Sequence, residues 1–177
     1  MPEEIEVPTE HLHEAMNEAA EEGGGFNLKV ALSSALIAVL AAICALIAGA
    51  RANEAVIDQI KASNTWSYYQ SKSIKATVLG SKVELLKSLG KKTDEKDVEK
   101  LGEYKKEMEE IKAEGDKLTK EAAELFESHE KLAKGVTLFQ IAIALSAIAV
   151  LTRKKQLWMV GLGLSLGGIY FLVIGLI

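Results

Sequence analysis

The stretch VALSSALIAVLAAICALIAGA, residues 30–50, decides the fold because it contains 21 residues without a charge. Two more charge-free stretches follow, of 18 residues over 135–152 and of 22 residues over 156–177. A helix needs roughly 20 apolar residues to cross the hydrocarbon core of a bilayer. A chain of 177 residues leaves too little other protein to bury three such helices. The sequence therefore predicts three membrane spans.

The first span is expected to be retained rather than cleaved as a signal peptide. Ala48–Ala50 resembles a small-residue cleavage site, but residues 1–25 carry eight Glu and no Lys or Arg, and the apolar run is too long. Residues 1–25 are predicted to form an acidic arm that contains one short capped helix. Cys44, the single cysteine, lies inside the span and is interpreted as a packing residue.

Between the first two spans lie residues 51–134, with 17 basic and 17 acidic residues and no Pro. The one break is LGKKTDEKD, residues 89–97, where Gly90 is suited to end a helix and Thr93 or Asp94 to begin the next. Because this break divides the segment into arms of similar length, it predicts an antiparallel helical hairpin with its turn near 90–94.

The predicted fold class is all-α, a membrane protein with three transmembrane helices and a long extramembrane hairpin between the first and the second. Its parts are an acidic arm (1–25), a first span (26–50), the hairpin (51–134), a second span (135–152), a basic turn (153–155) and a third span (156–177).

The returning arm has the clearest periodic pattern, in which apolar residues alternate steps of three and four while most other positions are Glu or Lys. This heptad seam predicts a coiled coil, and it continues into the second span, so we expect one continuous helix. His129 in the seam is expected to be hydrogen-bonded or edge-exposed, with a pH switch as the alternative. The seam is Leu101, Tyr104, Met108, Ile111, Gly115, Leu118, Ala122, Leu125, His129, Leu132, Val136, Phe139 and Ile143.

Stripes of small residues in the first and third spans predict close helix packing, because such residues let helix backbones approach each other in lipid. In the third span the stripe is Gly161, Gly168 and Gly175, which are seven residues apart, together with the pair Gly163 and Gly167. In the first span the stripe is Ala31, Ala35, Ala38, Ala42, Ala45 and Gly49.

The outgoing arm contains the aromatic stretch NTWSYYQSKSIK, residues 64–75. Trp66 lies 16 residues beyond Ala50, roughly 24 Å along a helix, which is too far for an interfacial belt. Trp158 and Phe26 suit that role better. The balanced charge of the segment argues against a nucleic-acid partner.

Helical projection gives this arm two contact faces, and a lone hairpin can use only one of them. One face carries Trp66 and Tyr69, and the other, the aliphatic face, carries Val56, Ile60, Ile74, Val78, Leu85 and Leu89. The second face therefore predicts a homo-oligomer. Midway along the aliphatic face, the polar patch Ser63, Ser67 and Gln70 either specifies register or lines a small cavity. The residues predicted for helix packing or oligomerisation on the other face are Trp66, Tyr69, Ala62 and Ser73, with Gly115 on the returning arm and Gly161, Gly168 and Gly175 in the third span.

A fold about residue 92 would place Tyr69 opposite Gly115 and Tyr104 opposite Gly80. A large residue opposite a glycine at two levels suggests that the aromatic side chains fill gaps in the partner helix.

VPTEHLHEA, the Ala-rich span and ANEAVIDQIKASNTWSYYQSKSIKA, residues 52–76, are similar to an uncharacterised bacterial membrane family, domain of unknown function 4337. The second and third spans, joined by a basic turn, also resemble this family, and the resemblance covers essentially the whole chain. It implies a bacterial inner-membrane protein and supplies no activity, substrate or cofactor.

The leading hypothesis is a non-enzymatic homo-oligomeric scaffold in the lipid bilayer, whose hairpins assemble through Trp66, Tyr69 and the small-residue stripes. A pore and a membrane sensor stay open as alternatives. No nucleophile–base pair, metal cluster or phosphate loop is visible, so we expect no cofactor. The short basic loop Arg153–Lys155 favours a cytoplasmic N-terminus and turn, with the hairpin and C-terminus in the periplasm.

Overall fold

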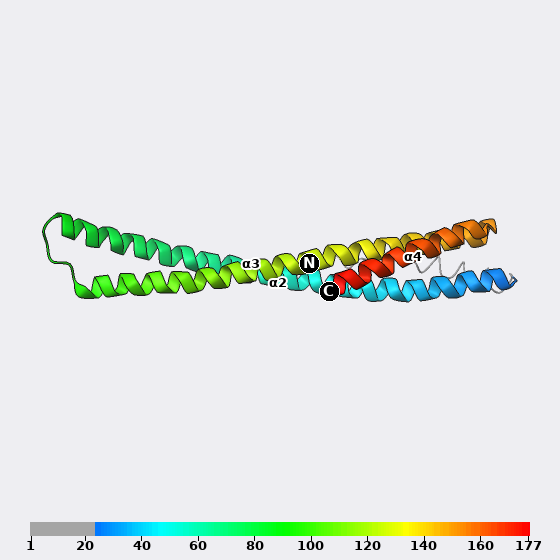
Figure 1. Cartoon of the computed structure of the whole chain (residues 1–177), viewed down its shortest axis with the longest axis horizontal. Helices are drawn as coiled ribbons and strands as arrows, with labels where there is room; N and C mark the ends of the chain where they lie inside the picture. The colour runs from blue at the N-terminus through cyan, green and yellow to red at the C-terminus, as the bar shows by residue number, and fades with distance from the viewer. Residues whose placement is uncertain (1–23) are drawn as a thin grey trace. The chain divides into compact units, whose positions relative to one another are not determined.

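The structure, a computed structural model, describes residues 24–177, and three α-helices account for nearly all of them (Figure 1). Helix α2 runs over Gly25–Ser88, α3 over Glu95–Thr152 and α4 over Lys155–Leu176. No strand occurs within these residues, so the described chain is all-α, as predicted. The predicted acidic arm lies outside the described residues except for Gly24 and Gly25.

The chain divides into two compact units. We call residues 24–53 and 125–177 the three-helix unit, and residues 54–124 the hairpin unit. The three charge-free stretches all lie in the three-helix unit, and each of the three helices is long and apolar enough to cross a membrane. Both α2 and α3 run without interruption from a span into an arm of the hairpin, as the continuous seam predicts for α3.

The hairpin turn forms where the sequence predicts it. Gly90 has a φ of 66°, its N–H donates to the carbonyl of Lys87 at 3.1 Å, and the N–H of Lys91 donates to the carbonyl of Leu86 at 2.9 Å. This pair of hydrogen bonds is a Schellman motif, which favours glycine at its left-handed position. Asp94 Oδ1 accepts the N–H of Lys96 at 3.1 Å, so Asp94 rather than Thr93 caps α3.

The buried face of α2 in the three-helix unit differs by one position from the predicted stripe of small residues. Ala35 and Ala42 of that stripe are exposed, and its other members are only half-buried. Because nearly every residue of this span is apolar, the sequence offers little contrast from which to read its orientation. The buried residues instead form a heptad seam of Val30, Ser34, Ile37, Ala41, Cys44 and Ala48.

The seam predicted for α3 is in the correct place, since all thirteen of its members are buried or half-buried. In the three-helix unit Leu132, Phe139 and Ile143 are fully buried and form the centre of the core. These side chains pack against the buried seam of α2 and against apolar residues of α4.

Candidate functional site

Three glycines bring α4 directly against α3. A Cβ atom added at Gly168 would lie 2.7 Å from the ring of Phe139, and one at Gly175 would lie 2.7 Å from Leu132 Cγ. A Cβ at Gly161 would lie 3.0 Å from the carbonyl oxygen of Ala142. All three glycines are buried, so the seven-residue spacing marks a real helix-packing face. Within the other predicted pair, Gly163 faces open space and does not contribute to this face.

In the three-helix unit, polar side chains form hydrogen bonds with backbone carbonyls of neighbouring helices. The Cys44 thiol donates to Leu132 at 3.3 Å, and the Ser128 hydroxyl donates to Gly175 near the end of α4 at 2.5 Å. His129 Nδ1 lies 2.9 Å from the carbonyl oxygen of Ala48. Since a carbonyl only accepts, Nδ1 carries the proton, and the expectation of a hydrogen-bonded histidine is confirmed.

In the hairpin unit, Trp66 fills the space left by Gly115. A Cβ at Gly115 would lie 3.0 Å from Trp66 Cε2, so only glycine allows this contact without movement of the indole. Trp66 Nε1 donates to the hydroxyl of Thr119 at 3.3 Å, and that hydroxyl donates to the carbonyl of Gly115 at 2.7 Å. The aromatic residue and the gap therefore belong to one junction between α2 and α3.

The predicted partners of the two glycines were wrong by about one helical turn. Trp66, not Tyr69, occupies the space at Gly115, and Leu101, not Tyr104, approaches Gly80 at 4.0 Å. The chain reverses abruptly at the Gly90 motif, so the arms are staggered relative to a fold centred on residue 92. The idea of large residues filling glycine gaps was correct at Gly115, with a different aromatic residue.

Two other aromatic residues of the junction, Tyr68 and Tyr104, lie beside Lys72. Its Nζ atom lies 5.4 Å from the ring centre of Tyr68 and 5.2 Å from that of Tyr104, and it forms an ion pair with Glu107. The hydrogen bond to Glu107 raises the pKa of Lys72 above its ordinary value. Tyr69 packs edge-on against Trp66, with ring centres 5.7 Å apart.

The face of α2 that carries Trp66, which the sequence analysis assigned to contacts between copies, packs against α3 of the same chain, whereas the opposite face is exposed. Ala62, on the Trp66 face, is buried, and Ser73 is half-buried. Across the helix, the polar patch Ser63, Ser67 and Gln70 is exposed. The exposed aliphatic side chains of this face, which we call the apolar ridge, are Val56, Ile60, Ile74, Val78, Leu85 and Leu89.

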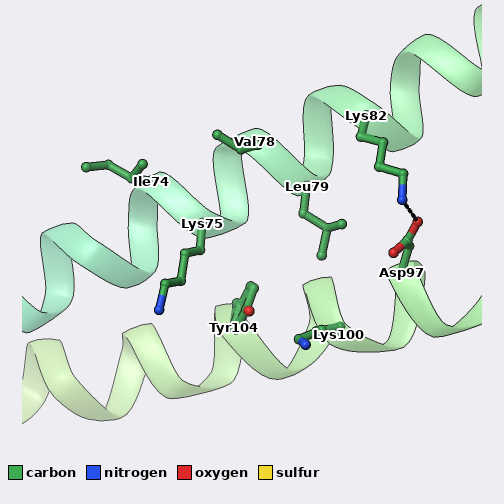
Figure 2. Close-up of a pocket in the computed structure, with 8 residues that line it drawn as sticks. All are labelled: Ile74, Lys75, Val78, Leu79, Lys82, Asp97, Lys100 and Tyr104. Carbon is green, nitrogen blue, oxygen red and sulfur yellow. Dashed lines mark ion pairs between the residues drawn. The ribbon is translucent and has the colours of Figure 1, made fainter.

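Figure 2 shows part of the ridge beside a shallow groove of about 410 Å³ between the two arms. Ile74 and Val78 point away from α3, while Leu79 and Tyr104 lie between the helices. Lys82 pairs with Asp97 across the groove at 2.6 Å, and this carboxylate raises the pKa of Lys82. The arms are therefore held together on one side of α2 only.

The family pattern described as domain of unknown function (DUF4337) matches residues 26–177. The chain belongs to this family. The match covers residues of both units. No curated protein and no solved structure matches the chain.

Two features of the site region were not predicted from the sequence. The buried face of the first span lies one position away from the predicted stripe, and the side chains that bond to carbonyls of neighbouring helices were not identified. Cys44, Ser128 and His129 form such bonds at one end of the three-helix unit. Only the spacing of His129 within the seam signalled a contact, because a hydrogen bond to a backbone carbonyl has no sequence pattern of its own.

Proposed function

We propose that the protein is a non-enzymatic, homo-oligomeric scaffold of the bacterial inner membrane, in which hairpins of neighbouring copies associate through the apolar ridge. The observation that carries this proposal is the exposure of the ridge, whose six side chains are each between 55% and 65% exposed. Unusually large exposed apolar patches mark interaction sites, and the ridge has exposed aliphatic side chains on both sides of the polar patch.

The size of the ridge suits a second copy. Its 34 residues extend over roughly 50 Å of helix, and a stripe roughly 10 Å wide amounts to about 500 Å² on each chain. Two copies would then bury about 1,000 Å² in total, which is near the minimum for a specific interface.

The pattern along the ridge favours copies that lie parallel and in register. Aliphatic residues occupy both ends of the ridge, and the polar patch Ser63, Ser67 and Gln70 separates them. Copies anchored in one bilayer place equal positions at equal heights, so that polar residues face polar residues. A shift by one heptad would set Ile60 against Ser67, which is unfavourable.

The proposed orientation rests on the basic residues near the spans. Arg153–Lys155 form a short loop between the second and third spans, whereas residues 51–134 form a long segment between the first and second. Because the positive-inside rule counts Lys and Arg in short loops and gives long loops less weight, this supports a cytoplasmic turn and a periplasmic hairpin. Labelling of single cysteines at Lys154 and Lys120 with an impermeant maleimide in intact cells tests it: only Lys120→Cys should react.

Crosslinking tests the proposed interface. In a Cys44→Ala background, which has no other cysteine, Ile60→Cys or Val78→Cys should give a disulfide-linked dimer on oxidation in membranes. Lys120→Cys, on an exposed face of α3, is the matched control and should give little dimer. Equal yields at all three positions, or no dimer at either ridge position, would contradict the proposal.

Within residues 24–177, no contact inside one chain favours a pore. The centre of the three-helix unit is filled by Leu132, Phe139 and Ile143, so a path for solutes would have to run between copies.

A further inference from the structure

The end of the three-helix unit that carries the turn between α3 and α4 is strongly cationic. Its ionisable side chains among the described residues are Lys29, Arg153, Lys154 and Lys155, and all four are exposed. Residues 24–53 and 135–177 contain no Asp or Glu, so no carboxylate within these ranges offsets the four charges. The opposite end differs, because Lys131 and Lys134 there are paired with glutamates.

Aromatic side chains join α2 and α4 at this cationic end. Phe26 and Trp158 pack edge to face with ring centres 5.9 Å apart, and Trp158 Nε1 donates to the hydroxyl of Ser33 at 3.0 Å. Lys155 Nζ lies 5.7 Å from the centre of the Phe26 ring. Trp is enriched at the level of the lipid headgroups. Because Trp158 lies at the start of a candidate span beside these cations, we expect the cations at the depth of the lipid phosphates.

Exposed apolar side chains lie on the same helix faces as two of these cations. Met159, four residues after Lys155, is 66% exposed, and Leu32, three residues after Lys29, is also 66% exposed. Residues three or four apart share a helix face. We call Lys29, Leu32, Lys155 and Met159 the corner of the unit. A ligand bound there meets ammonium groups at one level and apolar side chains further along the spans.

We infer that Lys29 and Lys155, with Phe26 and Trp158, form a binding site for the phosphate of an anionic phospholipid. The lipid phosphate accepts hydrogen bonds from the two ammonium groups, and its acyl chains cover Leu32 and Met159. Basic residues at the ends of transmembrane helices recognise anionic headgroups in this way.

The acidic N-terminal arm is the competing occupant, since eight Glu precede Gly24. Its carboxylates would satisfy the ammonium groups alone, whereas a phospholipid whose acyl chains cover Leu32 and Met159 brings its own phosphate to the same ammonium groups. A phospholipid satisfies both parts of the corner at once, which favours the lipid.

Fluorescence quenching at Trp158 tests the inference. The chain has two tryptophans, so Trp66→Phe leaves Trp158 as the only reporter, in a unit that does not contain Trp66. The full-length protein is reconstituted in phosphatidylcholine with increasing fractions of brominated phosphatidylglycerol or brominated phosphatidylcholine. We expect brominated phosphatidylglycerol to bind near Trp158 several-fold more tightly, because each Lys near the surface contributes roughly fivefold.

Two charge variants give the matched comparison. Lys29→Gln/Lys155→Gln should reduce the preference for phosphatidylglycerol at least fivefold, whereas Lys131→Gln/Lys134→Gln, at the opposite end, should leave it unchanged. Circular dichroism checks that both variants remain helical. Equal quenching by the two lipids, or a preference that survives Lys29→Gln/Lys155→Gln, would overturn the inference. It would also be overturned if the preference arose only after the eight Glu of the arm were changed to Gln.

Discussion

Helix α2 has two neighbours in the three-helix unit and one in the hairpin unit. In the three-helix unit α3 and α4 both contact it, through pairs such as Cys44 with Leu132 and Ser33 with Trp158. In the hairpin unit α3 contacts the face that carries Trp66, and the apolar ridge on the opposite face is exposed. The exposed aliphatic residues of the three-helix unit lie on helices apolar enough to cross a membrane, whereas those of the ridge lie on an arm between charged residues and form the interface proposed above. The face of α2 that is exposed and still apolar therefore lies in the hairpin unit.

The largest expected effect comes from filling the close helix contact in the three-helix unit. Gly168→Leu places a side chain where even a Cβ would lie 2.7 Å from the buried ring of Phe139, which cannot move aside. We expect a loss of about 3 kcal/mol in the free energy of unfolding, because overpacking forces the helices apart. Denaturant titration in detergent micelles measures it.

Gly163→Leu is the matched control for this change, since nothing lies within 4 Å of a Cβ at Gly163. Its free energy of unfolding should fall by no more than about 0.5 kcal/mol, and the better helix propensity of Leu offsets any loss. If the two variants unfolded alike, the glycine face of α4 would not be a packing face.

A smaller effect is expected at the junction in the hairpin unit. Gly115→Ala brings a Cβ within 3.0–3.3 Å of three atoms of the Trp66 indole. The indole is half-buried and can move partly, so we expect a net loss of about 1 kcal/mol in the free energy of unfolding. Thermal unfolding followed by Trp66 fluorescence in a Trp158→Phe background measures it.

Gly102→Ala, on the same hairpin but with nothing within 4 Å, should instead raise the free energy of unfolding by about 0.5–1 kcal/mol. In a double-mutant cycle, Trp66→Leu should remove most of the cost of Gly115→Ala. A cost that persisted without the indole would show that the two residues do not interact.

The sequence predicted some of these contacts and not others, for reasons visible in the residues. The seam of α3 was identified because its apolar members stand out among Glu and Lys, and Gly90 marked the turn because a Schellman motif favours glycine. The buried face of the first span was misplaced because Ala and Leu surround it on every side. The partner of Gly115 was missed because the stagger of the arms depends on where the turn reverses the chain.

The smallest expected effect concerns the ion pairs between the arms. Glu107 raises the pKa of Lys72 and Asp97 raises that of Lys82, above an ordinary value of 10.5. Each pair therefore contributes stability that is fully present below pH 10.5 and is lost as the pH rises through the raised pKa.

We expect the unfolding midpoint of the hairpin to fall on raising the pH above 10.5, and to fall less in Lys72→Gln/Lys82→Gln. Circular dichroism melts across this range measure the difference. The Lys82 side chain is exposed, so high salt should reduce the contribution of its pair with Asp97. An identical fall in the variant would show that these ion pairs do not contribute.

The mass of the particle in lipid nanodiscs tests the central claim most directly, that the apolar ridge joins copies of the chain. After subtraction of lipid and scaffold, the wild-type protein should have a mass of at least two copies of its 19.1 kDa chain. Ile60→Lys/Val78→Lys should shift the mass to one copy. Gln59→Lys/Thr77→Lys, which adds the same charge at neighbouring exposed positions, should not. A wild-type particle of one copy, or a ridge variant that stays oligomeric, would contradict the account.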